Sequence, residues 1–326
     1  MDFILQFVIQ WYVWVPIVVI LGVLTWRNYH KAESIDSYDY VLLALEIPRN
    51  NDKKELAAEQ LFASLHGILR DSEELRVSGG VQEHLSFEIA SVDEQIRFYV
   101  RVPKHLQNFV EGQIYAQYPT VQIHETNEDY AAVNSSMHPV IATSELVLTE
   151  NEFLPIKTFQ SFEVDPLAGI TAALSKLNAK NEEIWVQVLA RPIADDWQKR
   201  SARFVSRLKS GAGTHTNSGA LAYFVQIFEA LWKPPEATSG SSTKVELSDR
   251  TKAQIAAAET KSEKLGYAVK IRLAYLGSDP SASRIQLNAV AAAFKQFNST
   301  NLNGFKLAGT PSLAREDLTK YTTRQF

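Results

Sequence analysis

The stretch LSFEIASVDEQIRFYVR, residues 85–101, predicts two short β-strands joined by a tight connection. Both of its runs, residues 85–90 and 95–101, are strand-like in composition, and the polar link at residues 91–94 has the length of a hairpin loop. We therefore expect an antiparallel strand pair at this position. The elements on either side of the pair decide the fold class.

A helix and a strand are predicted on each side of this hairpin. Upstream, the apolar run at residues 41–47 is typical of a buried strand, and apolar residues at spacings of four and three over residues 57–68 favour an amphipathic helix. Downstream, a helix that begins at Pro103 precedes a short strand at residues 121–123. The order β-α-β-β-α-β is that of a ferredoxin-like unit, which we place at residues 38–127.

The second half of the chain shows the same order of elements. Two Asp-Pro pairs predict helix starts, because aspartate caps a helix and proline suits its first position. We expect a second ferredoxin-like unit at residues 144–310 and a C-terminal tail at residues 311–326. The predicted elements of this unit are a strand at 153–159, a helix from Asp165-Pro166, strands at 184–189 and 267–276, a helix from Asp279-Pro280 and a strand at Phe305 and Leu307.

Residues 193–265 exceed what this architecture requires and predict a helical insertion between two strands of the second unit. The insertion contains a basic helix, a mostly apolar segment at residues 220–232 and an alanine- and lysine-rich helix at residues 247–265. A basic helix beside an aromatic-rich one can contact protein, an anionic membrane surface or nucleic acid, and we favour protein. The candidate interaction residues are Trp197, Lys199, Arg200, Arg203, Phe204, Arg207, Tyr223, Phe224, Phe228 and Trp232.

Residues 3–26 carry no charged side chain, and a helix of this length would cross a hydrocarbon core of about 30 Å. We therefore expect a transmembrane anchor at residues 1–32, with the lipid bilayer as a partner and Trp26, Arg27 and Lys31 at the membrane boundary. Because positive charge follows the apolar run, the N-terminus is expected outside and the remaining chain in the cytoplasm. The predicted fold class is α+β: an N-terminal transmembrane helix followed by two tandem ferredoxin-like units, the second with a helical insertion.

The sequence contains no recognisable motif for catalysis, cofactor binding or metal binding. It has no cysteine, no P-loop, no dinucleotide-binding glycine motif and no zinc or calcium signature. Glu59 and His66 on one helix, and the adjacent Asp195 and Asp196, are explained better by structural roles and helix capping than by catalysis. The net charge of −4 argues against a general attraction to nucleic acid. We therefore predict that the protein is not an enzyme and has no cofactor, catalytic residue or metal site.

Five runs of the sequence are informative as a set and cover nearly the whole chain. They are AAEQLFASLHG at 57–67, FYVRVPKHLQNFVEGQIYAQYP at 98–119, FEVDPLAGITAALSKL at 162–177, and the runs at 186–197 and 265–276. As a set they resemble the membrane-anchored N-terminal region of type IV secretion-like and conjugative-transfer-like ATPases of small uncultivated bacteria, a largely uncharacterised domain. In those ATPases a P-loop motor domain is expected downstream, whereas the sequence here contains no P-loop.

The resemblance implies a non-catalytic, membrane-anchored cytoplasmic module that docks or organises a translocation ATPase. The implied partners are a P-loop ATPase on a separate chain and further copies of this chain in a homo-oligomer, and the implied location is the bacterial inner membrane. Two alternatives stay open: a membrane-bound nucleic-acid-binding module, in which Phe98 and Tyr99 would stack on bases, and a self-assembling membrane scaffold. A third is a hydrolase with an unrecognised site, which a tightly bound metal would support.

Overall fold

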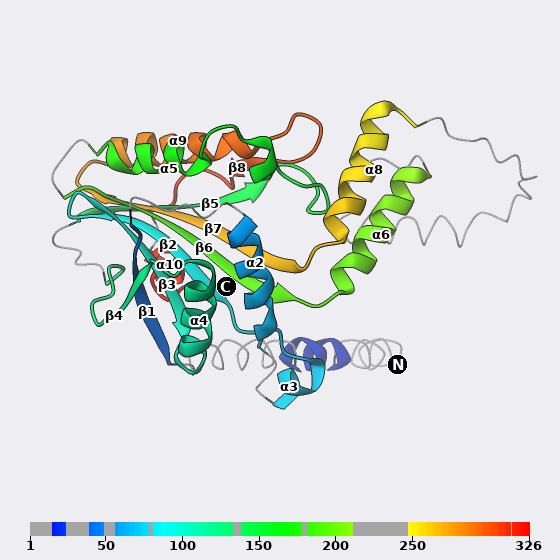
Figure 1. The fold of residues 1–326 in the computed structure, drawn as a ribbon, viewed down its shortest axis with the longest axis horizontal. Helices are drawn as coiled ribbons and strands as arrows, with labels where there is room; N and C mark the ends of the chain where they lie inside the picture. The colour runs from blue at the N-terminus through cyan, green and yellow to red at the C-terminus, as the bar shows by residue number, and fades with distance from the viewer. Residues whose placement is uncertain are drawn as a thin grey trace, which may run out of the picture.

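One antiparallel sheet of eight strands forms the centre of the described structure (Figure 1). The computed structural model describes residues 15–23, 39–48, 56–77, 81–132, 138–177, 181–210, 247–313 and 315–326. The strand order across the sheet is β4-β1-β3-β2-β6-β7-β5-β8. The strands are β1 (Tyr40–Glu46), β2 (Leu85–Val92), β3 (Gln95–Pro103), β4 (Gln122–Thr126), β5 (Val140–Leu148), β6 (Glu183–Ile193), β7 (Gly266–Gly277) and β8 (Phe305–Leu307).

Four helices cover one face of this sheet: α2 (Leu56–Leu65), α4 (Gln107–Gln117), α5 (Pro166–Ser175) and α9 (Pro280–Phe294). Alternate side chains of β2 show that both helix pairs lie on the same face, because Leu85 and Phe87 pack with α2 and α4 while Ile89 packs with α5 and α9. We call the opposite side of the sheet the rear face. The other helices are α3 (Ser72–Val77), α6 (Asp196–Lys209), α8 (Asp249–Ser262), α10 (Arg315–Thr322) and the 3₁₀ turns His66–Ile68, Lys104–Leu106, Phe159–Ser161 and Lys295–Phe297.

The predicted fold class, a transmembrane helix followed by two tandem ferredoxin-like units, is wrong. The two halves of the chain share one continuous sheet, because β2 pairs with β6 from Leu85 opposite Ala190 to Ser91 opposite Ile184. Without this pairing β2 and β6 would both be edge strands with unpaired N–H and C=O groups. The structure is therefore a single α+β sheet with its helices, and its middle is the junction between the two halves.

The predicted membrane anchor is not supported by the described residues. Residues 15–23 form a helix whose side chains are exposed. No helix in the described ranges is long and apolar enough to cross a membrane. The remainder of the predicted span, and the boundary residues Trp26, Arg27 and Lys31, lie outside those ranges.

The strand that begins the second half was predicted at residues 153–159, and this prediction is wrong. The strand is β5, at Val140–Leu148, and residues 153–159 form a connection that ends in a 3₁₀ turn. Leu154 made the connection resemble a strand, but its side chain is fully buried against the helical insertion and not in the sheet. Polar residues at the centre of β5 (Thr143, Ser144 and Glu145) concealed the true strand, because they weaken its apolar pattern.

The hairpin and the two Asp-Pro helix starts lie where the sequence predicts them. Residues 93 and 94 form the turn between β2 and β3. The carboxylates of Asp165 and Asp279 each accept a hydrogen bond of 2.8 Å from a backbone N–H of the first turn of α5 and of α9. These caps satisfy N–H groups that the helices cannot bond internally, which explains why both helices begin there.

The insertion between β6 and β7 extends from the sheet as a pair of packed helices, α6 and α8 (Figure 1). Strands β6 and β7 pair as far as Ile193 opposite Gly266, and Trp197 at the start of α6 closes over this end. A Cβ atom at Gly266 would lie 2.2 Å from Nε1 of Trp197, so this close approach requires glycine. Residues 211–246, and with them the predicted contact residues Tyr223, Phe224, Phe228 and Trp232, lie outside the described ranges.

A small hydrophobic core joins α6 and α8 to the sheet domain. Leu154, from the connection after β5, packs with Phe204 and Val205 of α6 and with Ile255 of α8. Asn303 stabilises this connection, because its buried side chain forms hydrogen bonds with backbone groups of residues 150–154 and 304. The insertion is therefore held against the second half of the chain by Leu154 and its supporting loop.

We expect Asn303→Ala to lower the free energy of unfolding by about 2–3 kcal/mol, because buried N–H and C=O groups lose their partners. The bonds lost include those from Nδ2 to the Asn151 and Leu154 oxygens, at 2.8 and 3.1 Å, and the bond from the Glu150 N–H to Oδ1, at 2.9 Å. Urea denaturation measures the change. Asn301→Ala, at an exposed position of the same loop, is the control and should change stability by less than about 0.5 kcal/mol.

Candidate functional site

The structure offers two candidate surfaces, and the first is the exposed side of α6. Its four cations Lys199, Arg200, Arg203 and Arg207 are exposed and lie at helical spacings of three and four, which places them on one side of the helix. We call these four residues the basic face of α6. The opposite side of α6 is buried and holds Trp197, Ser201, Phe204, Val205 and Leu208.

Half of the basic face is already paired with acidic groups. Lys199 lies 3.0 Å from a carboxylate oxygen of Asp196, and Arg200 lies 3.5 Å from one of Glu152. The hydrogen bond from Lys199 is the main reason that the pKa of Asp196 is lowered. Within the described ranges, Arg203 and Arg207 form no ion pair with a carboxylate. Both guanidinium groups are at exposed positions of α6.

The structure separates the ten predicted interaction residues into three sets. The four cations of the basic face are exposed, as a contact surface requires. Trp197 and Phe204 are buried, Trp197 over Gly266 and Phe204 in the core beneath α6, so they support the helix and are not on its exposed side. The other four aromatic residues fall in residues 211–246, outside the described ranges.

The second candidate surface is a row of polar side chains across the middle of the rear face. Glu88 of β2 lies opposite Gln187 of β6, which lies opposite Arg272 of β7, which in turn lies opposite Glu145 of β5. We call these four residues the polar row. Glu88, Gln187 and Arg272 are buried although all three are polar. Buried polar groups need partners, and each of these three has one in residues 315–326.

We call residues 315–326 the C-terminal segment, which contains α10 and was predicted as a tail. Arg324 of this segment is 1% exposed and forms a two-pronged ion pair with Glu88, from Nε and Nη2 to the two carboxylate oxygens, each at 3.0 Å. Asp129 binds the same guanidinium, with Nη2 at 2.8 Å from Oδ1 and Nη1 bonded to Oδ2. Tyr130 donates a 2.6 Å hydrogen bond to Glu88. Arg324 is thus enclosed by two carboxylates and a tyrosine.

Burial and ion pairing have opposite effects on the pKa values of Arg324 and Asp129. Burial by itself would lower the pKa of Arg324, but the charge of Glu88 and the hydrogen bonds to Asp129 and Glu88 raise that pKa above its ordinary value. Burial likewise opposes the ionised form of Asp129, yet the hydrogen bond from Arg324 holds its pKa below the usual range. Both groups are therefore charged at neutral pH and form an ion pair.

Side chains of the sheet also donate to backbone carbonyls of the C-terminal segment. The carbonyls at the end of α10 carry the negative end of the helix dipole, so cationic side chains that contact them stabilise this arrangement. Phe326 packs over the sheet as well, with the Arg191 guanidinium 4.0 Å from its ring centre. The four bonds are Arg272 Nη1 to the Lys320 oxygen (3.0 Å), Gln187 Nε2 to the Tyr321 oxygen (3.1 Å), Arg101 Nη1 to the Thr323 oxygen (2.9 Å) and His84 Nε2 to the Arg324 oxygen (2.8 Å).

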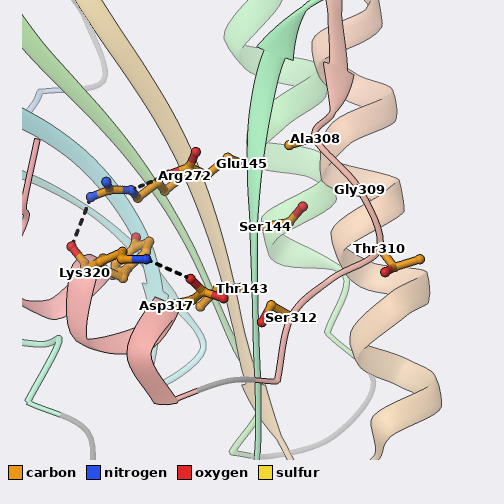
Figure 2. Close-up of a pocket in the computed structure, with 11 residues that line it drawn as sticks. Thr143, Ser144, Glu145, Arg272, Ala308, Gly309, Thr310, Ser312, Asp317 and Lys320 are labelled. Carbon is orange, nitrogen blue, oxygen red and sulfur yellow. Dashed lines mark hydrogen bonds and ion pairs between the residues drawn. The ribbon is translucent and has the colours of Figure 1, made fainter. Parts of the chain in front are cut away.

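A cavity of about 260 Å³ lies beside this contact, between β5, the stretch after β8 and α10 (Figure 2). Its charged groups are already paired: Arg272 donates to Glu145 at 2.8 Å, and Lys320 lies 3.4 Å from Asp317. A hydrogen bond from Ser312 is the main cause of the lowered pKa of Asp317. The cavity offers hydroxyl groups and neutralised charges to a polar ligand.

Of the two pairs that the sequence assigns to structural roles, Glu59 and His66 make structural contacts, whereas the side-chain capping predicted for the aspartates at α6 is not observed. Glu59 bonds to Lys264, and Nε2 of His66 lies 3.3 Å from the Ile193 carbonyl, so both tie α2 and its 3₁₀ turn to the base of the insertion. Asp195 is the N-cap residue of α6, although its side chain makes no capping bond. In the described ranges no group of three His, Asp or Glu side chains is placed to hold a metal ion.

Sequence reasoning missed the arginine site, although one signal was available. Glu88 and Gln187 occupy rear-face positions two residues from Ala90 and Trp185, which are buried and apolar. A charged residue at such a position needs a buried partner of opposite charge. Nothing local identifies Arg324 as that partner, because it lies 236 residues away in the chain.

The comparisons with known proteins give the chain a family but no activity. No curated protein matches the sequence. The model of a family described as a domain of unknown function (DUF8128) matches residues 30–325. This range contains the whole sheet, the insertion and nearly all of the C-terminal segment. Because the match covers most of the chain, the protein belongs to the DUF8128 family.

Proposed function

We propose that this protein is a non-catalytic docking module that binds a P-loop ATPase on a separate chain through the basic face of α6. The observation that carries the proposal is the pair Arg203 and Arg207, two exposed guanidinium groups on a helix whose other side is anchored in a hydrophobic core. A rigid helix that presents cations is suited to an acidic protein surface. The sequence resemblance described above supports an ATPase of the type IV secretion or conjugation kind as the partner.

The same resemblance supports a position at the cytoplasmic side of the bacterial inner membrane, where such an ATPase would assemble. It also supports self-association, because translocation ATPases of this kind are expected to be hexameric. The described residues contribute directly to neither the membrane location nor the self-association. The docking role depends on neither of these two points.

The nucleic-acid alternative is less favoured by the geometry. Tyr99, one of the two aromatic residues that would stack on bases, is only 6% exposed because Tyr130 stacks on it at 4.9 Å. Trp185 on the same rear face is buried beneath Tyr130 and Tyr321. A base would have to displace these side chains to reach the sheet.

We expect the double variant Arg203→Glu and Arg207→Glu to lose the ATPase in a crosslinked pull-down of the full-length protein, by about tenfold or more. The readout is the amount of P-loop ATPase, identified by mass spectrometry, per molecule of bait. The matched control is Arg250→Glu with Lys252→Glu on α8, which changes net charge equally at exposed positions and should retain the ATPase.

Two outcomes would contradict the proposal. One is equal recovery of the ATPase by the double variant and its control, which would exclude the basic face as the contact. The other is recovery of no ATPase by the unaltered protein together with a salt-sensitive shift of single-stranded DNA, which would favour the nucleic-acid alternative.

A further inference from the structure

The contact between the C-terminal segment and the rear face resembles a bound peptide more than an ordinary core element. Among residues 317–326, only Tyr321 and Arg324 are buried. A helix that belongs to a core normally buries a continuous apolar stripe. Over residues 317–322, α10 buries one aromatic ring, Tyr321, which packs on Trp185 in the hydrophobic cluster of the rear face. The segment is instead held mainly through its backbone carbonyls and through Arg324. A separate peptide of the same sequence could make these contacts.

The sheet side of this contact is specific for an arginine followed by an aromatic residue two positions later. Glu88 and Asp129 accept four N–H bonds from the Arg324 guanidinium in a fork geometry that lysine cannot reproduce. The centre of the Phe326 ring lies 5.5 Å from the centre of the His84 ring and 4.0 Å from the Arg191 guanidinium. The charges are complementary: the sheet supplies acids for the arginine and cations for the carbonyls and the aromatic ring.

The stretch that connects the segment to β8 is only lightly attached. Residues 308, 309, 310 and 313 are exposed, and a Cβ atom at Gly309 would meet nothing within 4 Å. The attachments to the sheet are an N–H bond from Ala308 to Glu145 at 2.9 Å and two bonds between Thr143 and Ser312, each at 2.8 Å. Such a connection can move without disturbing the hydrophobic cores, which is the geometry that allows an element to be exchanged between copies.

We infer that the rear face is a binding site for an Arg-x-aromatic peptide, occupied here by the chain's own C-terminal segment and open in exchange to the same segment of a second copy. The occupant from the second copy would present the same Tyr321, Arg324 and Phe326 to the same partners. The inference does not involve the basic face of α6, so it stands or falls independently of the proposed docking function.

The test uses the full chain with a recognition site for a specific protease inserted between the exposed residues Gly309 and Thr310. After cleavage, we expect residues 310–326 to stay bound and to exchange with a fluorescent synthetic peptide of the same sequence in native buffer, as measured by anisotropy. A competing peptide with Arg324→Gln should require at least about tenfold higher concentration, because charge-assisted bonds are lost. A peptide with Gln325→Ala, at an exposed position, should compete like the original.

Exchange that occurs only at the rate of global unfolding would overturn the inference, since the segment would then be an inseparable part of the fold. Equal competition by the Arg324→Gln peptide would also overturn it. Exchange with a second copy is tested by light scattering of the uncut protein. The fraction of dimer should increase with protein concentration, and excess peptide should convert the dimer to monomer. A protein that stays monomeric at every concentration, or a dimer that the peptide leaves intact, would contradict that part.

Discussion

Replacement of Arg324 by methionine is expected to lower the free energy of unfolding by about 3–5 kcal/mol, the largest effect of any single substitution considered for this chain. The physical reason is the environment of Glu88, whose side chain is 0% exposed and would lose the guanidinium that pairs with it, with no water to replace it. Asp129 is partly exposed and can be rehydrated, so most of the cost is expected to come from Glu88. Urea denaturation followed by circular dichroism measures the loss.

A double-mutant cycle distinguishes loss of the ion pair from loss of packing. Arg324→Met combined with Glu88→Leu removes both charges, and we expect the double variant to be more stable than the sum of the single changes predicts, by about 1–3 kcal/mol. Arg284→Met, at an exposed position of α9, controls for the removal of an arginine and should change stability by less than about 0.5 kcal/mol. Strict additivity of the two single changes would show that Arg324 and Glu88 do not stabilise each other.

Acid is expected to destabilise the protein through His84. Burial lowers the pKa of His84 from 6.5 to about 4, opposed by its bond to the Arg324 carbonyl and reinforced by the charges of Arg101, Arg191 and Arg272. The unfolded chain therefore binds a proton between pH 6.5 and 4 that the folded chain excludes, so stability is present above pH 6.5 and is lost as the pH falls toward 4. The gap between these values corresponds to about 3 kcal/mol.

The variant that isolates this effect is His84→Gln, whose amide N–H can still donate to the Arg324 carbonyl but does not titrate. We expect its unfolding free energy to decline less between pH 7 and 4 than that of the unaltered protein. The matched control is His124→Gln on β4, where the histidine side chain is 57% exposed, and it should leave the pH dependence unchanged. The prediction fails if His84→Gln and His124→Gln have the same pH profile.

The cations of the basic face could be predicted from the sequence, but the burial of its neighbouring aromatic residues could not. The basic face of α6 follows from Lys199, Arg200, Arg203 and Arg207, because an amphipathic spacing alone places cations on the exposed side of a helix. The same spacing did not distinguish aromatic contact residues from core residues. Trp197 and Phe204 lie on the buried side of α6, and their burial depends on Gly266 and on Leu154, which are distant in the sequence.

Short-range chemistry is sufficient to specify several local elements from the amino-acid sequence: the hairpin at 85–101, the helices begun by Asp165 and Asp279, and the alternating strand at 267–276. Hydrogen bonds between near neighbours and the periodicity of apolar residues specify these elements. The tertiary structure alone decided that β2 pairs with β6 and that Arg324 lies on Glu88. Both depend on strand register and on groups far apart in the chain, and the free energy that favours them appears only when the edges and charges are buried together.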